Sequence, residues 1–242
     1  EYDKDERISI ITTEFSKGLE MLNELEEGFY KSGPLKNRFF DMTYKILHRD
    51  ETINDLIAWN HDIQEQLNKD VIQFLSIIPE LKSRGLPNSR GIILSGPPGT
   101  GKTMMAKSLA NQTQISTMLI SAEMIYAKNQ VKTAFELARK LSPTLMIIED
   151  IDTAGTVSRR FTDHPILGEY LQSLDGMEPN NGIVLLATTN HTENIDPAIS
   201  DRPGRFDRII EIPLPSQAQR KKVLVNYLRK LDCEEDIEET CL

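Results

Sequence analysis

One short loop, Gly96-Pro97-Pro98-Gly99-Thr100-Gly101-Lys102-Thr103, constrains the fold of this chain more than any other segment. It matches the pattern G-x-x-x-x-G-K-[ST] at every fixed position, and it lies between an apolar stretch and a helical pattern. In such a strand–loop–helix unit, backbone N–H groups and the positive end of the helix stabilise an anion. We expect Lys102 to reach the β- and γ-phosphates of ATP, and the Thr103 hydroxyl to hold Mg²⁺. The predicted ATP-binding residues of the loop are Gly96, Pro97, Pro98, Gly99, Thr100, Gly101, Lys102, Thr103 and Met104.

A second apolar stretch, residues 145–148, ends in the adjacent carboxylates Glu149 and Asp150. Carboxylates at the end of a buried strand are costly unless a cation or a proton uses them. A Mg²⁺ ion at the nearby phosphate loop provides that use, and one carboxylate can activate the attacking water. We therefore predict a Mg²⁺ site made of Thr103, Glu149 and Asp150.

After Pro87, short apolar runs alternate with helical patterns, which is typical of a three-layer α/β domain with a parallel sheet. Continuous apolar runs such as residues 183–188 are expected for strands that are covered on both faces. The expected strands are 91–95, 117–121, 145–149, 183–188 and 208–212, and the expected helices are 102–111, 128–141 and 219–231. The sequence thus predicts a P-loop NTPase fold with a five-stranded parallel sheet.

The residues before this domain have helical spacing instead. The spaced apolar positions are Ile8, Ile11, Phe15, Leu22, Leu25 and Phe29, then Leu35, Phe39, Met42 and Ile46, then residues 63–81. We predict a helical N-terminal region at 1–50, the large α/β subdomain at 51–215, and the start of an incomplete helical lid at 216–242. The apolar stripes of the N-terminal region either pack against a neighbouring element or bind an adaptor. The sequence begins with Glu1 and not with Met, so an N-terminal extension can have preceded it.

Composition narrows the function classes. The net charge of −9 disfavours nucleic acid as the main partner. Cys233 and Cys241 offer neither a disulfide framework nor metal-ligand spacing, which favours the cytoplasm or another reducing compartment. No apolar run approaches the ~20 residues needed to cross a bilayer, so we expect no membrane segment.

Further motifs between residues 52 and 231 resemble the AAA family of P-loop ATPases. Residues 183–190 resemble the strand that ends in the family's sensor asparagine, which makes Asn190 the positioner of the attacking water. The segment Arg202-Pro203-Gly204-Arg205-Phe206-Asp207 resembles the region that donates two arginines to the ATP of the adjacent subunit. Arg202 and Arg205 occupy those positions.

Two weaker similarities complete the resemblance. Residues 174–177 look like the inter-subunit signalling segment, and Asp55 and Ile57 fall where the family holds the adenine. The resemblance implies a homo-oligomeric ring, a hexamer, in which ATP hydrolysis drives remodelling, unfolding or disassembly of a protein partner. The implied catalytic residues are Lys102, Glu149, Asp150, Asn190, Arg202 and Arg205.

The chain also departs from the family pattern. The family usually ends its acidic strand Asp-Glu, whereas this chain has Glu149 followed by Asp150. Asp150 is one methylene shorter than the usual base, so a scaffold or switch that hydrolyses ATP slowly is the alternative function. Tyr126 is the single aromatic between Ser121 and Phe135, and it is the candidate for contact with a threaded substrate.

Overall fold

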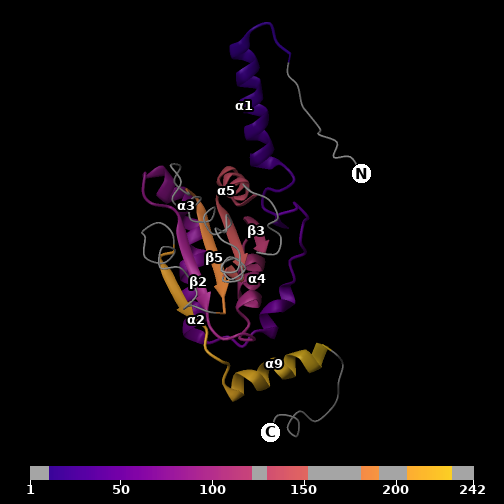
Figure 1. Cartoon of the computed structure of the whole chain (residues 1–242), viewed down its shortest axis with the longest axis vertical. Coiled ribbons are helices and arrows are strands. Elements are labelled where there is room, and N and C mark those ends of the chain that lie inside the picture. The colour runs from indigo at the N-terminus through magenta and orange to yellow at the C-terminus, as the bar shows by residue number, and fades with distance from the viewer. Residues whose placement is uncertain (1–10, 122–129, 152–180, 191–205, 231–242) are drawn as a thin grey trace, which may run out of the picture.

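The computed structural model describes residues 11–121, 130–151, 181–190 and 206–230 (Figure 1). Among these residues, six strands form one sheet in the order β1-β3-β4-β5-β2-β6. All neighbouring strands are parallel. The strands are β1 Phe39–Asp41, β2 Arg90–Ser95, β3 Ser116–Ser121, β4 Thr144–Glu149, β5 Ile183–Thr189 and β6 Arg208–Glu211. The α/β class and the parallel sheet are therefore confirmed.

The predicted count of five strands was wrong, because β1 adds a sixth strand at the edge of the sheet beside β3. The spacing of Leu35, Phe39, Met42 and Ile46 had predicted a helix here. Phe39 and Phe40 instead point into the two opposite core clusters of the sheet, and both are buried. A strand can bury both adjacent aromatic side chains in this way, since successive residues alternate between its faces. Part of the predicted N-terminal region thus belongs to the sheet.

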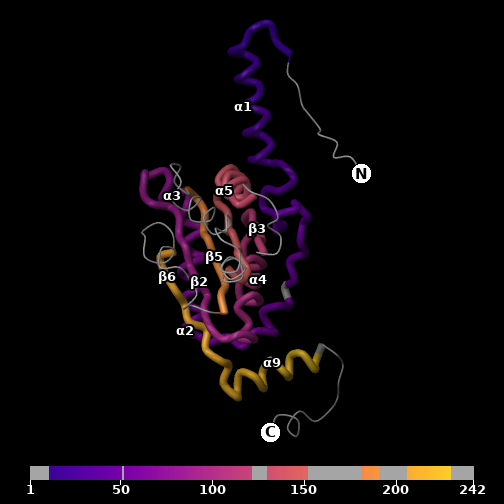
Figure 2. The backbone as a smooth tube through the Cα atoms, viewed as in Figure 1, coloured from indigo at the N-terminus to yellow at the C-terminus, as the bar shows by residue number. Residues whose placement is uncertain are grey.

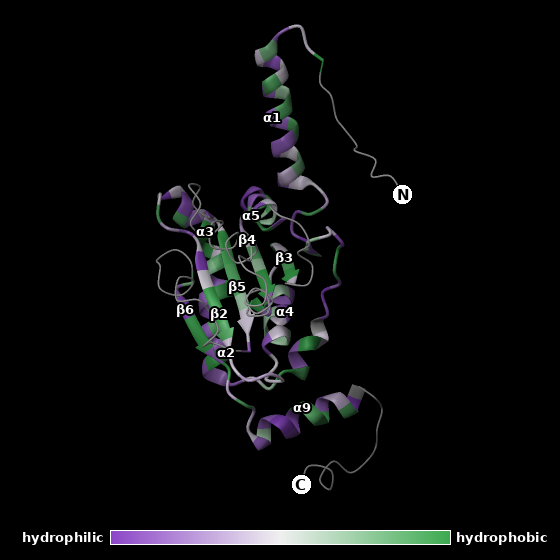
Figure 3. Cartoon of the chain, viewed as in Figure 1, coloured by the Kyte–Doolittle hydropathy of each residue, from purple (hydrophilic) through white to green (hydrophobic). Residues whose placement is uncertain are grey.

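The sheet lies between two layers, and alternate strand residues face opposite layers. Leu67, Val71, Ile78 and Met105 cover one face, and Val131, Phe135 and Ala138 cover the other. All seven residues of β5 are buried, as expected for a strand that is covered on both faces. The apolar strands stand out at the centre of the molecule in Figure 3.

Within the described residues, the α-helices are α1 Phe15–Ser32, α2 His61–Leu67, α3 Phe74–Ser83, α4 Lys102–Gln112, α5 Gln130–Lys140 and α9 Gln217–Lys230. A 3₁₀ turn, η1 Glu51–Leu56, precedes α2, and a π-helical stretch, η2 Asn68–Gln73, joins α2 to α3. Helix α1 contains no buried residue, and α1 and α9 extend from opposite ends of the sheet domain (Figure 2).

Candidate nucleotide site

Three neighbouring strands bring the phosphate loop, the acidic pair and Asn190 to one edge of the sheet. Strand β5 lies between β4 and β2, and it pairs Thr189 with Ser95 and Ala187 with Ile148. The carboxyl ends of these parallel strands therefore coincide. The phosphate loop follows β2, Asn190 follows β5, and Asp150 follows β4. Ligands of open α/β sheets bind outside the carboxyl ends of the strands.

The loop glycines are required for two different reasons. A Cβ atom on Gly96 would lie 2.2 Å from the carbonyl oxygen of Ile212, so no side chain fits between the loop and the residue after β6. Gly99 and Gly101 have φ angles of 77° and 90°, which favour glycine. A Cβ atom at either position would meet open space. The outer side of the loop is thus free to approach a ligand closely.

Lys102, the first residue of α4, places a buried ammonium group inside the loop. Its residue is 5% exposed. Its Nζ donates hydrogen bonds of 2.7 Å to the carbonyl of Gly96 and 2.8 Å to that of Pro97. The first-turn N–H groups of α4 lie beside it and have no acceptor within the helix. This concentration of positive charge fits a polyphosphate.

The two carboxylates at the end of β4, Glu149 and Asp150, have different partners. Glu149 Oε1 lies 2.9 Å from Nζ of Lys107, which is on α4. The N–H of Asp150 donates a 3.0 Å hydrogen bond to Oγ1 of Thr188. Asn190 Nδ2 lies 3.4 Å from Asp150 Oδ1 and donates to it. Two different sequence motifs predicted Asp150 and Asn190 as site residues. The structure brings these two side chains together.

Asp150 also has an unusual backbone conformation, with a φ angle of 51°. The left-handed region costs a residue with a side chain roughly 1 kcal/mol, although aspartate tolerates it better than most. The contacts with Thr188 and Asn190 hold this conformation. Residues held in sparsely populated backbone regions cluster at active sites.

Sequence reasoning missed Lys107. It lies four residues after Thr103, so the two share one face of α4. That spacing was a usable signal, because the same face was already expected to meet the acidic strand end. The oxygen donors of Thr103 and Asp150 suit Mg²⁺, which prefers hard oxygen ligands.

The predicted adenine residues, Asp55 and Ile57, lie in and directly after the turn η1, which accepts hydrogen bonds from α4 and α9. Asn54 accepts a hydrogen bond from Ser108 of α4. The carbonyl of Asp55 accepts one from Asn226 of α9. Ile57 is 5% exposed and belongs to the core cluster that includes α4, so its side chain serves packing.

Four predicted features lie outside the described residues: Tyr126, Arg202, Arg205 and the segment 174–177. Within the described ranges, no helix is both long and apolar enough to cross a membrane. The same ranges contain no group of three or more His, Cys, Asp or Glu side chains that could hold a metal ion.

Comparison with known proteins adds independent findings. Residues 92–214 match the profile of the ATPase family associated with various cellular activities (AAA). A proteasome-activating nucleotidase from Methanocella arvoryzae is 33% identical over 192 residues, which is 73% of this chain and 46% of that protein. The ATP-dependent zinc metalloprotease FtsH from Acidothermus cellulolyticus is 35% identical over 70% of this chain and 27% of its own length.

A cell division cycle protein 48 homolog from Archaeoglobus fulgidus is 33% identical over 78% of this chain and 27% of its own length. The chain thus spans about half or less of these curated relatives.

Proposed function

Since the chain belongs to the AAA family of ATPases, we propose that it is a Mg²⁺-dependent ATPase. In this proposal, copies of the chain assemble into a ring, a hexamer, whose ATP turnover drives remodelling, unfolding or disassembly of a protein partner. One observation carries the catalytic part. The phosphate loop, Asp150 and Asn190 follow three adjacent parallel strands, and the Asn190 amide donates to the Asp150 carboxylate at 3.4 Å.

The proposed reaction is in-line attack of water on the γ-phosphate of ATP, with cleavage of the bond to the bridging oxygen of ADP. Asp150 accepts the proton of the attacking water. The amide of Asn190, which donates a hydrogen bond to the Asp150 carboxylate, orients that water. Lys102 stabilises the charge that develops on the phosphoryl oxygens.

Mg²⁺ supplies charge neutralisation at the β- and γ-phosphates when it is bound. Thr103 and Asp150 provide oxygen donors for it at the carboxyl edge of the sheet. Glu149 has one carboxylate oxygen 2.9 Å from Lys107, so its contribution to the water shell of the metal falls to the other oxygen. Lys107 thereby ties the end of β4 to the helix of the phosphate loop.

Arg202 and Arg205 are proposed to complete the site of the adjacent subunit. An arginine supplied by a neighbour contributes about 10³- to 10⁵-fold to phosphoryl transfer. An isolated subunit is therefore expected to be nearly inactive. The steady-state ATPase rate per subunit should rise steeply with protein concentration, and Arg205→Ala should abolish this rise while ATP binding persists.

The names of the relatives support a protein partner. One is a nucleotidase that activates a proteasome, and another is an ATP-dependent protease. The net charge of −9 still disfavours nucleic acid as the partner.

The cytoplasm or another reducing compartment stays our prediction for the location. Tyr126 stays the candidate for contact with a threaded substrate. Crosslinking to an Asp150→Asn variant, which should bind ATP without turning it over, would identify the partner.

The slow scaffold or switch is the second candidate, and one observation favours it. Glu149, the longer carboxylate of the pair, is engaged by Lys107, so the shorter Asp150 must reach the water. A misplacement of about 1 Å can cost ~10²-fold in rate. Tight ATP binding in a fully assembled ring, with turnover too slow to drive remodelling, would establish the switch and reject the motor.

A further inference from the structure

The helix α9 lies beyond the carboxyl ends of the strands, on the side of the phosphate loop (Figure 1). The chain reaches it directly from β6. The N–H of Ile212, a residue that is 2% exposed, donates a 2.7 Å hydrogen bond to the carbonyl of Ser95. Ser95 is the last residue of β2, and the phosphate loop begins at the next residue. The segment that leads to α9 is therefore attached to the beginning of the phosphate loop.

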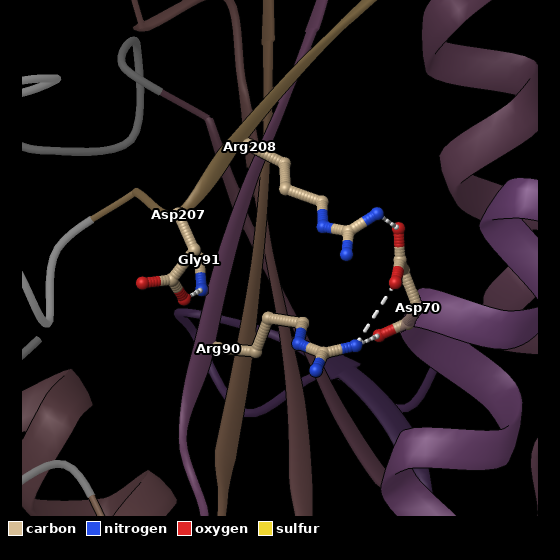
Figure 4. A network of polar contacts seen from close by, with 5 residues as sticks. All are labelled: Asp70, Arg90, Gly91, Asp207 and Arg208. Atoms are coloured by element: carbon tan, nitrogen blue, oxygen red, sulfur yellow. Dashed lines mark hydrogen bonds and ion pairs between the residues drawn. The ribbon is translucent and has the colours of Figure 1, made fainter.

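This attachment is firm, because β6 is held to β2 at both of its ends. At the beginning of the strands, the buried carboxylate of Asp70 lies 3.0 Å from Nη1 of Arg90 and 2.9 Å from Nη1 of Arg208 (Figure 4). Arg90 begins β2 and Arg208 begins β6. At the other end, Ile212 is bonded to Ser95. A movement of α9 relative to the sheet is therefore expected after Ile212.

The first turn of α9 contains a side chain with two tasks, Gln219. Its Oε1 accepts a 2.8 Å hydrogen bond from the N–H of Ser216, and the Ser216 Oγ accepts one of 3.3 Å from the N–H of Gln219. This reciprocal pair is a capping box, which stabilises the start of a helix. The Nε2 of Gln219 donates to the carbonyl of Trp59 at 3.0 Å and lies 3.5 Å from that of Ala58. Gln219 therefore both caps α9 and joins it to the segment after η1.

A second amide, Asn226, lies on the same face of α9. It follows Gln219 by seven residues, which is about two helical turns. Its Nδ2 donates to the main-chain carbonyl of Asp55, within η1. Both amides thus hold α9 against main-chain carbonyls of residues 55–59. We call these two side chains, Gln219 and Asn226, the α9 latch.

The segment that the latch contacts is joined to the helix of the phosphate loop. The side-chain oxygen of Asn54 accepts a hydrogen bond from Ser108 and another, of 3.4 Å, from Gln112. Both donors lie on α4, which begins with Lys102 of the phosphate loop. The phosphate loop is therefore connected to α9 on two sides, through Ile212 before the loop and through η1 after it.

We propose that the α9 latch sets how fast a nucleotide leaves the phosphate loop. This inference rests on the proposed function, in which ATP binds at the carboxyl edge that α9 faces. Opening this edge requires α9 to move away from residues 55–59, so the amide–carbonyl bonds of Gln219 and Asn226 must break. They are positioning residues, because they act through the placement of α9. One neutral hydrogen bond of this kind changes such an equilibrium about fivefold.

The variants Gln219→Glu and Asn226→Asp test the latch with almost no change in shape. Glutamate keeps the oxygen that accepts from Ser216, so the capping box and the start of α9 should persist. Each variant removes the amide donor and places a carboxylate against a main-chain carbonyl. Fluorescently labelled ADP is bound to the full chain, chased with unlabelled ATP and followed by stopped-flow fluorescence. Release should be about fivefold faster in each single variant and about 25-fold faster in the double variant.

Gln217→Glu is the matched control. Gln217 is exposed and lies in the same first turn of α9, so this change adds the same charge without touching the latch. Its ADP release rate should stay within about twofold of the unmodified rate. Urea unfolding and the amount of ADP bound per chain are measured on the same preparations. A purely structural role would lower the stability and leave the release rate of the folded chains unchanged.

The outcomes are distinct. Faster release in both single variants, with the control unchanged, supports the inference. A double variant that releases ADP at the unmodified rate overturns it. Equal acceleration by Gln217→Glu overturns it as well, because the added charge alone would then explain the effect. If Lys102→Ala binds ADP as tightly as the unmodified chain, the proposed nucleotide site itself fails and the role of the latch falls with it.

Discussion

Asp70 and Asp150 are both aspartates beside the same sheet, yet they lie at opposite edges of it and have different surroundings. Asp70, at the amino edge, is 1% exposed and engages two arginines at 2.9 and 3.0 Å. Asp150, at the carboxyl edge, is partly exposed and meets the Asn190 amide at 3.4 Å. The first carboxylate is neutralised by cations of its own chain. The second lies at the same edge of the sheet as the phosphate loop, where we propose that ATP binds.

Replacing Asp70 should produce the largest change in stability. Asp70→Ala leaves the guanidinium groups of Arg90 and Arg208 without their shared carboxylate. Breaking a buried ion pair costs about 3–5 kcal/mol, and we expect the lower end because both arginines are partly exposed. Urea unfolding would measure the loss. Asp62→Ala on the exposed side of α2 should change it by less than ~0.5 kcal/mol, and equal losses would end the contrast between the two edges.

Replacing Asp150 should have the opposite effect, with a large loss of ATPase rate and a small change in stability. Asp150→Asn keeps the side-chain shape but removes the proposed base, so the ATPase rate should fall about 10²- to 10⁴-fold. The free energy of unfolding should fall by less than in Asp70→Ala, because Asp150 is partly exposed whereas Asp70 is buried. Steady-state ATPase assays and urea unfolding of one preparation test both parts. A variant that loses stability while keeping its rate would assign Asp150 to structure.

The two edges also differ in how far sequence could predict them. The phosphate loop, Asp150 and Asn190 belong to local patterns that carry their own chemical reason, and the sheet topology then brings the ends of their strands together. Asp70 has partners 20 and 138 residues away, and a single acid in a helical pattern looks like a solvated residue. Its role exists only once β2 and β6 are adjacent.

The strand β1 was missed for a related reason. Its three residues are too few for a period-two pattern, and the apolar spacing around them matches a helix. The pairing with β3, which is about 80 residues away in the chain, decides its conformation. Long-range pairing overrides local spacing in so short a segment.

At the carboxyl edge, replacing Lys107 should lower the ATPase rate less than replacing Asp150 does. Lys107→Met keeps the helix and the aliphatic stem but removes the cation 2.9 Å from Glu149. The freed Glu149 adds uncompensated negative charge beside Asp150, so we expect about a 10-fold lower ATPase rate. Glu149→Gln in the same background should restore part of it. Rates and Mg²⁺ titrations of the single and double variants measure this coupling, and strictly multiplicative effects would show that the pair is independent of the site.

A third carboxylate, Glu26 on the exposed helix α1, extends the comparison to solvent. It pairs with Lys140 of α5, and both side chains are 47% exposed. The hydrogen bond that Lys140 donates to Glu26 raises the pKa of Lys140 above its ordinary value. This contribution to stability is therefore present below the unfolded pKa of lysine and is lost as the pH rises through the folded pKa. Because water screens the pair, Glu26→Gln should cost at most ~0.5 kcal/mol at pH 7, and the difference from the unmodified chain should disappear as the pH rises through the folded pKa of Lys140. Urea unfolding at pH 7 and over a series of higher pH values tests this, and a loss as large as that of Asp70→Ala would mean that exposure does not rank these carboxylates.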